Sequence, residues 1–212
     1  MHNSIALIRK DFILTRKFAL LLIPYFVLML YSNAQAYTVF SLLPALLLLI
    51  NACTIDMQHN NQKFLATLPV PRQQLIQAKY MTIIPLSLFS LICTLIMYWI
   101  AVTLGKLDDP LRWRELGLIT AVIPLLASFY LPLYYWLGQK GMQFVNVVFM
   151  MVIMLSFTTF GSLNKEFPAL AQWVQNGKIE NMLLLVIGVL AYLIIIYASY
   201  LISSRIYMHK DI

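Results

Sequence analysis

Long stretches without a single charged residue dominate this chain of 212 residues. Its 15 Lys and Arg and its 8 Asp and Glu residues all lie outside five stretches rich in Leu, Ile, Val and Phe: residues 18–55, 80–105, 116–139, 141–164 and 181–204. A charged side chain at the centre of a spanning helix costs roughly 2.5–3.5 kcal/mol on insertion scales. Uncharged apolar stretches of this length therefore predict an all-α, polytopic membrane protein.

The first of these stretches is too long for one span, because about 20 residues cross a bilayer. The polar sequence Ser32-Asn33-Ala34-Gln35 lies near its middle, with apolar residues on both sides. We therefore predict that this stretch folds back on itself. The chain is then a single transmembrane domain, residues 1–212, with six spans at about 18–32, 37–54, 81–104, 117–137, 142–161 and 182–204.

The distribution of charge supports six spans and predicts their orientation. With six spans, the side that holds both termini carries ten basic and three acidic residues, and the opposite side carries five of each. Cytoplasmic loops collect Lys and Arg, so both termini are expected in the cytoplasm. Basic residues in short loops beside a membrane bind anionic lipid headgroups. Nucleic acid is not an expected partner.

The composition of the spans argues against catalysis by this chain. No Asp, Glu, His or Arg lies within a predicted span, so no buried acid, base or ion relay is available there. The three histidines, His2, His59 and His209, all lie in segments outside the spans, and the sequence predicts neither a metal site nor a catalytic residue. The phosphate-binding pattern Gly-x-x-x-x-Gly-Lys-Ser/Thr is missing from the sequence. No cofactor is expected on this chain.

The longest predicted cytoplasmic loop lies between the second and third spans. Met57, Phe64 and Leu68 recur in it at i, i+7 and i+11, which is typical of one face of a short helix. Pro69 and Pro71 end this helix, and Pro71 suits the first turn of the next one. The alternative is a solvated loop whose few apolar residues rest against the headgroups.

The sequence resembles the membrane subunits of ABC-2 type exporters, in particular the short permeases associated with export of, or resistance to, amphipathic and antimicrobial peptides. The resemblance lies in the opening Leu7-Ile8-Arg9-Lys10-Asp11-Phe12, in Asp56 followed by the Leu-Pro-x-x-Arg pattern ending at Arg72, and in Lys79-Tyr80. It implies a cytosolic ABC ATPase as a partner, which would hold ATP and Mg, and a second permease subunit that is the same or a homologous chain.

By this resemblance the loop helix is a coupling helix, which docks on the ATPase and transmits its movement to the membrane. The implied coupling residues are Asp56, Phe64, Leu65, Leu68, Pro69, Pro71, Arg72, Lys79 and Tyr80. Phe64 and Leu68 would supply the apolar anchor.

Two further segments are expected to lie at the membrane surface. Ile5, Ile8 and Phe12 share roughly one helical face, which predicts an N-terminal interfacial helix, although a basic flank that only sets orientation explains the segment equally well. Residues 167–174 are amphipathic and too short to span, and they resemble the outer re-entrant helices of the family. The alternative is a surface helix anchored by Trp173.

The fifth predicted span is the candidate substrate surface, because it contains four of the eleven methionines. Flexible, polarizable Met side chains suit a wall that accepts varied apolar partners. In the family the second and fifth spans line the cleft between two membrane subunits. The candidate cleft residues are Ser41, Asn51, Asn146, Met150, Met151, Met154, Phe157 and Thr158. The alternative is an ordinary lipid-facing or helix-packing surface.

These observations favour the permease subunit of an ATP-driven exporter that moves a hydrophobic or amphipathic solute, such as a peptide, lipid or drug, out of the cell. Two other classes stay open. A membrane-resident immunity or sensor protein would share this layout without transporting anything, and an intramembrane enzyme is a weaker alternative.

Overall fold

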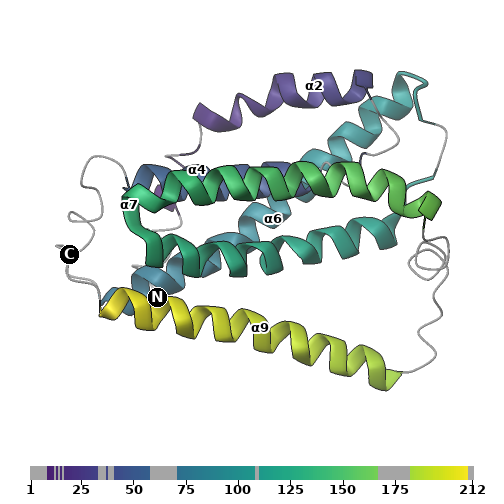
Figure 1. Ribbon diagram of the computed structural model, residues 1–212. Coiled ribbons are helices and arrows are strands. Elements are labelled where there is room, and N and C mark those ends of the chain that lie inside the picture. The colour runs from purple at the N-terminus through teal and green to yellow at the C-terminus, as the bar shows by residue number, and fades with distance from the viewer. Residues whose placement is uncertain are drawn as a thin grey trace.

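The structure is a computed structural model of the chain, and it describes residues 9–11, 13, 15, 17–32, 37, 41–57, 71–107, 110–166 and 182–209. All regular structure within these residues is helical, which confirms the prediction of an all-α protein. The helices form a bundle of elongated rods (Figure 1). They are α2 (Leu22–Ser32), α4 (Leu42–Met57), α6 (Arg72–Thr103), α7 (Trp113–Glu166) and α9 (Met182–Met208).

Helix α7 consists of two arms that run in opposite directions. The reversal falls at Gly138, whose φ of 64° and ψ of −164° interrupt the helix. Only glycine adopts such a conformation readily, because it has no Cβ atom. Gly141 lies on the inside of the reversal, where an added Cβ would come within 2.6 Å of the Cβ of Leu137. The two glycines explain why the chain turns back between the predicted spans 117–137 and 142–161.

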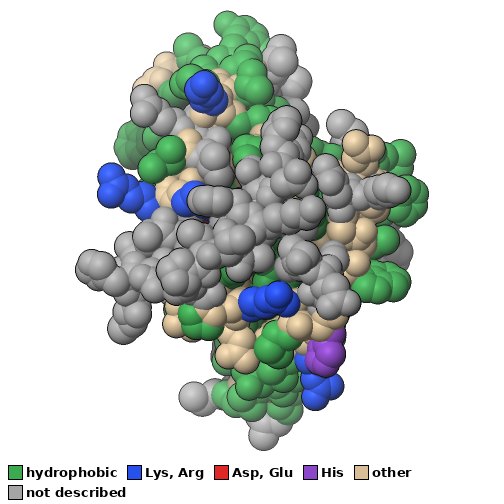
Figure 2. All heavy atoms as spheres, turned by 90° about the vertical axis from the view of Figure 1, so that its left-hand side faces the viewer, with side chains coloured by type: hydrophobic (Ala, Val, Ile, Leu, Met, Phe, Trp, Pro, Cys, Tyr) green, Lys and Arg blue, Asp and Glu red, His purple; other side chains and the backbone are tan. Residues whose placement is uncertain are grey.

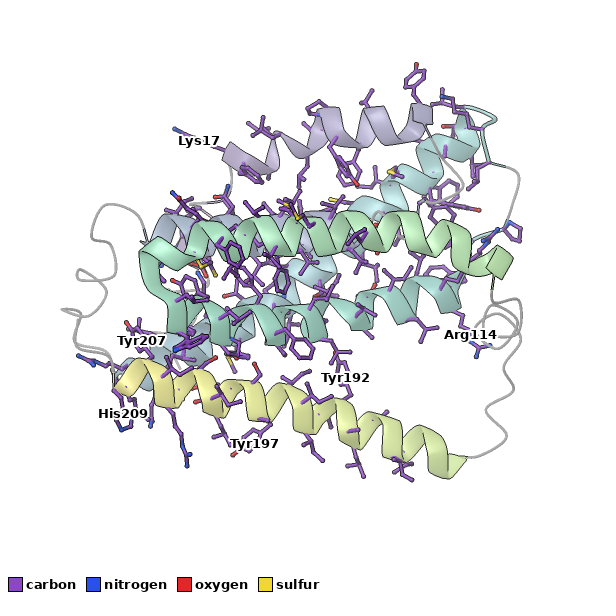
Figure 3. The ribbon with its side chains drawn as sticks, in the orientation of Figure 1. Lys17, Arg114, Tyr192, Tyr197, Tyr207 and His209 are labelled. Atoms are coloured by element: carbon purple, nitrogen blue, oxygen red, sulfur yellow. The ribbon has the colours of Figure 1, made fainter. Side chains whose placement is uncertain are left out.

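The helical arms alternate in direction along the chain (Figure 1). Helix α6 begins, and α4 and α9 finish, at the left-hand end of the bundle, where α7 also reverses. We call this end the Lys79 end. Figure 3 places Lys17, Tyr207 and His209 there and Arg114 at the opposite end. Helix α7 packs against α4, α6 and α9, and α4 also packs against α6.

Helix α4 lies at the centre of the bundle. Leu46, Leu48 and Leu49 are at most 2% exposed, and they pack with Tyr130 and Leu131 of the first arm of α7. Residues 42–50 of α4 are all apolar and suit this position, because no face of this part must reach a polar surrounding.

Helix α9, in contrast, turns large apolar side chains outward over most of its length. Leu193, Ile194 and Tyr197 are all more than half exposed. Exposed apolar surface of this extent is typical of a face covered by lipid or by another protein. Within the part of the chain that the structure describes, three helices are long and apolar enough to cross a membrane, namely Arg72–Thr103, Trp113–Gly138 and Val186–Met208. Shorter apolar helices are Lys17–Val27, Leu42–Met57 and Gly141–Met151. The number of spans stays a prediction.

Four helices extend beyond the predicted spans, namely α4, α6, α7 and α9, and α6 extends furthest. Helix α6 begins at Arg72, directly after Pro71, nine residues before the apolar stretch predicted to start at 81. Helix α7 continues to Glu166. A helix requires only backbone hydrogen bonds, whereas a span also requires an apolar surface. As a result, α6 carries Lys79 in its first turns as part of a continuous rod.

Several predicted features lie outside the described residues. These are the coupling helix with Phe64, Leu65, Leu68 and Pro69, the re-entrant segment 167–174, and Ile5, Ile8 and Phe12 of the N-terminal segment.

Candidate functional site

Four charged side chains meet at the Lys79 end of the bundle. The Nζ atom of Lys79 donates hydrogen bonds to Oδ2 of Asp56 at 2.6 Å and to Oδ2 of Asp11 at 3.1 Å. The Nζ atom of Lys10 donates to Oδ1 of Asp56 at 2.7 Å and lies 3.4 Å from Oδ1 of Asp11. Each ammonium group therefore contacts both carboxylates. We call Lys10, Asp11, Asp56 and Lys79 the ion cluster.

Three different parts of the chain contribute to the ion cluster. Asp56 lies in the last turn of α4, and Lys79 lies two turns into α6. Lys10 and Asp11 precede α2, in a segment where residues 9–11, 13, 15 and 17–19 are helical. The hydroxyl of Thr82, one turn beyond Lys79, lies 3.5 Å from Oδ2 of Asp11.

The ion cluster is largely shielded from its surroundings. Asp11, Asp56 and Lys79 are each at most 5% exposed, whereas the side chain of Lys10 is 32% exposed. Burying an unpaired charge costs several kcal/mol, so groups placed here must neutralise one another. Two ammonium groups face two carboxylates, and their formal charges sum to zero. The cluster is thus electrically complete without any further ion.

The pKa of Asp56 reflects this arrangement. Burial by itself would raise the pKa, but the ammonium groups of Lys79 and Lys10 outweigh burial and hold the pKa of this carboxyl below its usual value. Asp56 is therefore a carboxylate throughout the physiological pH range. Oδ1 of Asp11 is the least satisfied atom of the cluster, because it accepts no hydrogen bond from any described residue.

Pairing of the acids inside the bundle leaves the outer surface of this end basic. Arg9, Lys17, Arg72 and Arg205 are all exposed. Figure 2 shows this end from outside, with Lys and Arg side chains around it and no described Asp or Glu in view. A surface of this kind attracts anionic lipid headgroups or acidic protein surfaces.

Hydrogen bonds between helices connect the ion cluster to the rest of the bundle. Tyr80, the neighbour of Lys79, shares hydrogen bonds with the hydroxyls of Ser199 at 2.6 Å and Ser203 at 2.9 Å, which joins α6 to α9. Ser199 in turn donates to the carbonyl of Ser128 in the first arm of α7. Further along α9, Tyr192 points toward that arm (Figure 3) and donates to the Ala121 carbonyl at 3.1 Å.

A second set of linked hydrogen bonds joins the two arms of α7 to α4. The Tyr130 hydroxyl donates to Oδ1 of Asn146 at 2.9 Å, and Nδ2 of Asn146 donates to the Thr54 hydroxyl at 3.1 Å. In an apolar surrounding such bonds hold helices together, because the alternative is an unpaired polar group.

The structure brings together part of the predicted coupling set. Asp56 and Lys79 contact each other, Tyr80 bonds to α9, Pro71 directly precedes α6, and Arg72 is exposed at its first turn. Asp56 and Lys79 are turned into the bundle, so their charged atoms face each other and the N-terminal segment.

The predicted cleft residues are spread over different surroundings. Ser41 is fully buried, and its carbonyl accepts a hydrogen bond from Ser90 of α6. Asn51 and Met150 are half-buried, whereas Met151 is 59% exposed. The side chains of Met154, Phe157 and Thr158 lie outside the described part of the structure.

The sequence did not single out Lys10 and Asp11 as site residues. They were counted only as part of a basic flank and of a family motif. One signal was available, because Asp11 is the only acid among the first 55 residues and directly follows two basic residues. An acid of this kind is a candidate for an ion pair, but the sequence does not identify its partner.

The fold and the site together define a membrane-embedded helical protein in which a buried ion cluster and several hydrogen bonds join the helices. A family model described as "ABC-2 family transporter protein" matches residues 6–208. The chain therefore belongs to the ABC-2 transporter family, and it is the kind of subunit that forms the transmembrane part of an ABC transporter and is not itself catalytic. Searches of curated proteins and of solved structures gave no match to this chain.

Proposed function

We propose that this chain is the permease of an ATP-driven exporter that moves a hydrophobic or amphipathic solute out of a bacterial cell. The match to the ABC-2 transporter family over residues 6–208 carries this proposal. ATP is hydrolysed on a separate cytosolic ATPase, since this sequence contains no phosphate-binding loop. Both termini, and with them the Lys79 end, face the cytoplasm.

The basic surface of the Lys79 end supports this orientation. Exposed Lys and Arg side chains gather there, as expected of the cytoplasmic side of a membrane protein. In this orientation residues 58–70 are cytosolic, where the predicted coupling helix would bind the ATPase through Phe64 and Leu68. Two copies of the chain, or this chain and a homologue, would pair and each would bind one ATPase.

The second arm of α7 is the proposed wall of the substrate path. Phe144, Val147, Met151 and Leu155 are exposed on it and recur at helical spacing, so they form one continuous apolar face. An uncharged face suits an amphipathic peptide, lipid or drug that enters partly from the bilayer. Asn146 lies just beside this face but is held by Tyr130 and Thr54, so it would contact a solute only after exchanging those bonds.

Binding of the ATPase is the first test. The tagged permease is purified in mild detergent, and the ATPase that accompanies it is identified and measured. Phe64→Ala combined with Leu68→Ala is expected to abolish this association, because it removes the apolar anchor. Asn61→Ala combined with Gln62→Ala is the matched control from the same loop and is expected to retain it. Unchanged binding by the first pair would show that the coupling assignment is wrong.

Directional movement is the second test. The complex is reconstituted in vesicles, and a fluorescent cationic amphipathic peptide is supplied on the side of the ATPase. ATP-dependent accumulation of the peptide inside vesicles, abolished by vanadate, is the expected result. Stimulated ATP hydrolysis without accumulation would contradict export of this probe and favour a sensor.

A further inference from the structure

The N-terminal helical segment presents one narrow face to the bundle. Asp11 and Thr15 are buried, and Phe18 and Leu22 pack against the apolar core, a spacing of i, i+4, i+7 and i+11. Arg9, by contrast, is exposed. The buried face therefore carries a carboxylate at one end and apolar side chains at the other. A segment that only attracted headgroups would have no reason to bury its single acid.

The ion cluster connects this carboxylate to the two helices that flank residues 58–70 in the sequence. Asp56 closes α4 before that segment, and Lys79 lies in the first turns of α6 after it. The 2.6 Å contact between them joins the two helices directly. Lys10 and Asp11 add a second contact to each helix, so the N-terminal segment completes a closed set of ion pairs.

We infer that Lys10 and Asp11 are positioning residues for energy coupling, which clamp the N-terminal helix to the ends of α4 and α6 so that the three move as one body. This inference rests on the proposed function, because it concerns how movement of the ATPase reaches the membrane. This role requires no contact of either residue with the ATPase or the solute. They act by keeping Asp56 and Lys79 fixed on either side of the coupling segment.

Geometry favours a clamp over a simple salt bridge. A lone pair of Asp56 and Lys79 would leave one oxygen of the carboxylate and part of the ammonium group without a partner in a shielded site. Lys10 takes the free oxygen of Asp56 at 2.7 Å, and Asp11 takes the ammonium group at 3.1 Å. Removing either N-terminal residue leaves an uncompensated charge behind, and the effect reaches both helices.

The clamp is tested first on the permease alone, by amide hydrogen exchange of peptides covering residues 9–19. Lys10→Gln and Asp11→Asn are each expected to raise the exchange rate about tenfold or more. Local opening of the segment then breaks fewer ion pairs and costs less free energy. Lys10→Arg keeps the charge and is expected to retain the protection. Arg9→Gln is the matched control, since it removes the same charge from an exposed neighbour. Equal exchange in Lys10→Gln, Asp11→Asn and Arg9→Gln would overturn the inference.

Coupling is tested on the complex with its ATPase, by measuring how much of the fluorescent amphipathic peptide enters vesicles for each ATP hydrolysed. Asp11→Asn and Lys10→Gln are expected to lower this ratio about tenfold while the ATPase still binds. Lys10→Arg keeps the charge and is expected to keep the wild-type ratio. A merely structural role would reduce the amount of folded protein and leave the ratio unchanged, and that outcome would overturn the inference. If the wild-type chain binds no ATPase, the proposed function fails instead, and the exchange measurement still decides whether the clamp exists.

Discussion

Replacing Lys79 by methionine tests how strongly the ion cluster holds this fold together. The substitution keeps an unbranched side chain of similar length and removes only the ammonium group. That group lies 2.6 Å from Oδ2 of Asp56 and 3.1 Å from Oδ2 of Asp11. In Lys79→Met the two carboxylates share one cation, Lys10. One buried negative charge is left without compensation.

The expected loss of stability follows from this excess charge. Removing one partner of a buried ion pair destabilises a protein by about 3–5 kcal/mol, because the other charge stays desolvated. For a chain of this size, about 2–4 °C in melting temperature corresponds to 1 kcal/mol, so the midpoint should fall by about 6–20 °C. The lower part of this range applies if water reaches Asp56 through the partly exposed Lys10.

The measurement is thermal unfolding of the purified protein in detergent, followed by tryptophan fluorescence. Lys17→Met is the matched control, because Lys17 is exposed and belongs to the same basic end. It is expected to unfold at the wild-type temperature. Adding Asp11→Asn to Lys79→Met removes the excess carboxylate and leaves a neutral pair of Lys10 and Asp56. The double variant should therefore be more stable than Lys79→Met alone.

Two results would refute this reasoning. One is a melting temperature of Lys79→Met equal to that of Lys17→Met, which would show that the carboxylates are not desolvated. The other is a double variant less stable than Lys79→Met, which would show that Asp11 stabilises the fold by some contact other than its ion pairs.

Three further predictions use the same unfolding assay. Gly141→Ala should lose about 1–3 kcal/mol of stability through overpacking at the reversal of α7. Gly188→Ala is its control and should be at least as stable as wild type, because the added Cβ meets nothing within 4 Å beyond its own stretch of helix. Tyr130→Phe should lose about 0.5–1.5 kcal/mol because it deletes an interhelical hydrogen bond, and Tyr197→Phe, an exposed position, should be neutral. The stability difference between wild type and Asp56→Asn should be constant from pH 8 to 5 and shrink below about pH 4. The lowered pKa of Asp56 gives this sign, since stability from a carboxylate with a depressed pKa is lost only as pH falls through the folded value.

Much of the fold could be predicted from the sequence, because a helix that crosses lipid needs about 20 apolar residues and excludes charged ones. The prediction of an all-α membrane protein is confirmed, and the chain reverses where the uncharged stretches 116–139 and 141–164 meet. That the reversal falls at Gly138 was not predicted, because its backbone conformation is known only from the structure. The extension of α6 back to Arg72 was not predicted, since it depends on helix formation outside the apolar stretch.

The candidate site could be predicted only in part. The family pattern pointed to Asp56 and Lys79, but as residues that couple the membrane subunit to an ATPase and not as partners of each other. In the structure these two residues pair with each other and with Lys10 and Asp11, which lie 46 and 68 residues away along the chain from Asp56 and Lys79 respectively. No periodicity relates residues at such separations, so the isolated acid Asp11 could be noticed in the sequence but its partner could not be identified from it.

The sequence by itself determined which parts of the chain are too apolar for water, because each residue carries its own transfer free energy wherever it lies. Only the tertiary structure decided which charges at the Lys79 end face outward and which neutralise one another. That choice depends on distances between side chains from three separate segments, and a Coulomb interaction changes steeply over the few ångströms that packing sets.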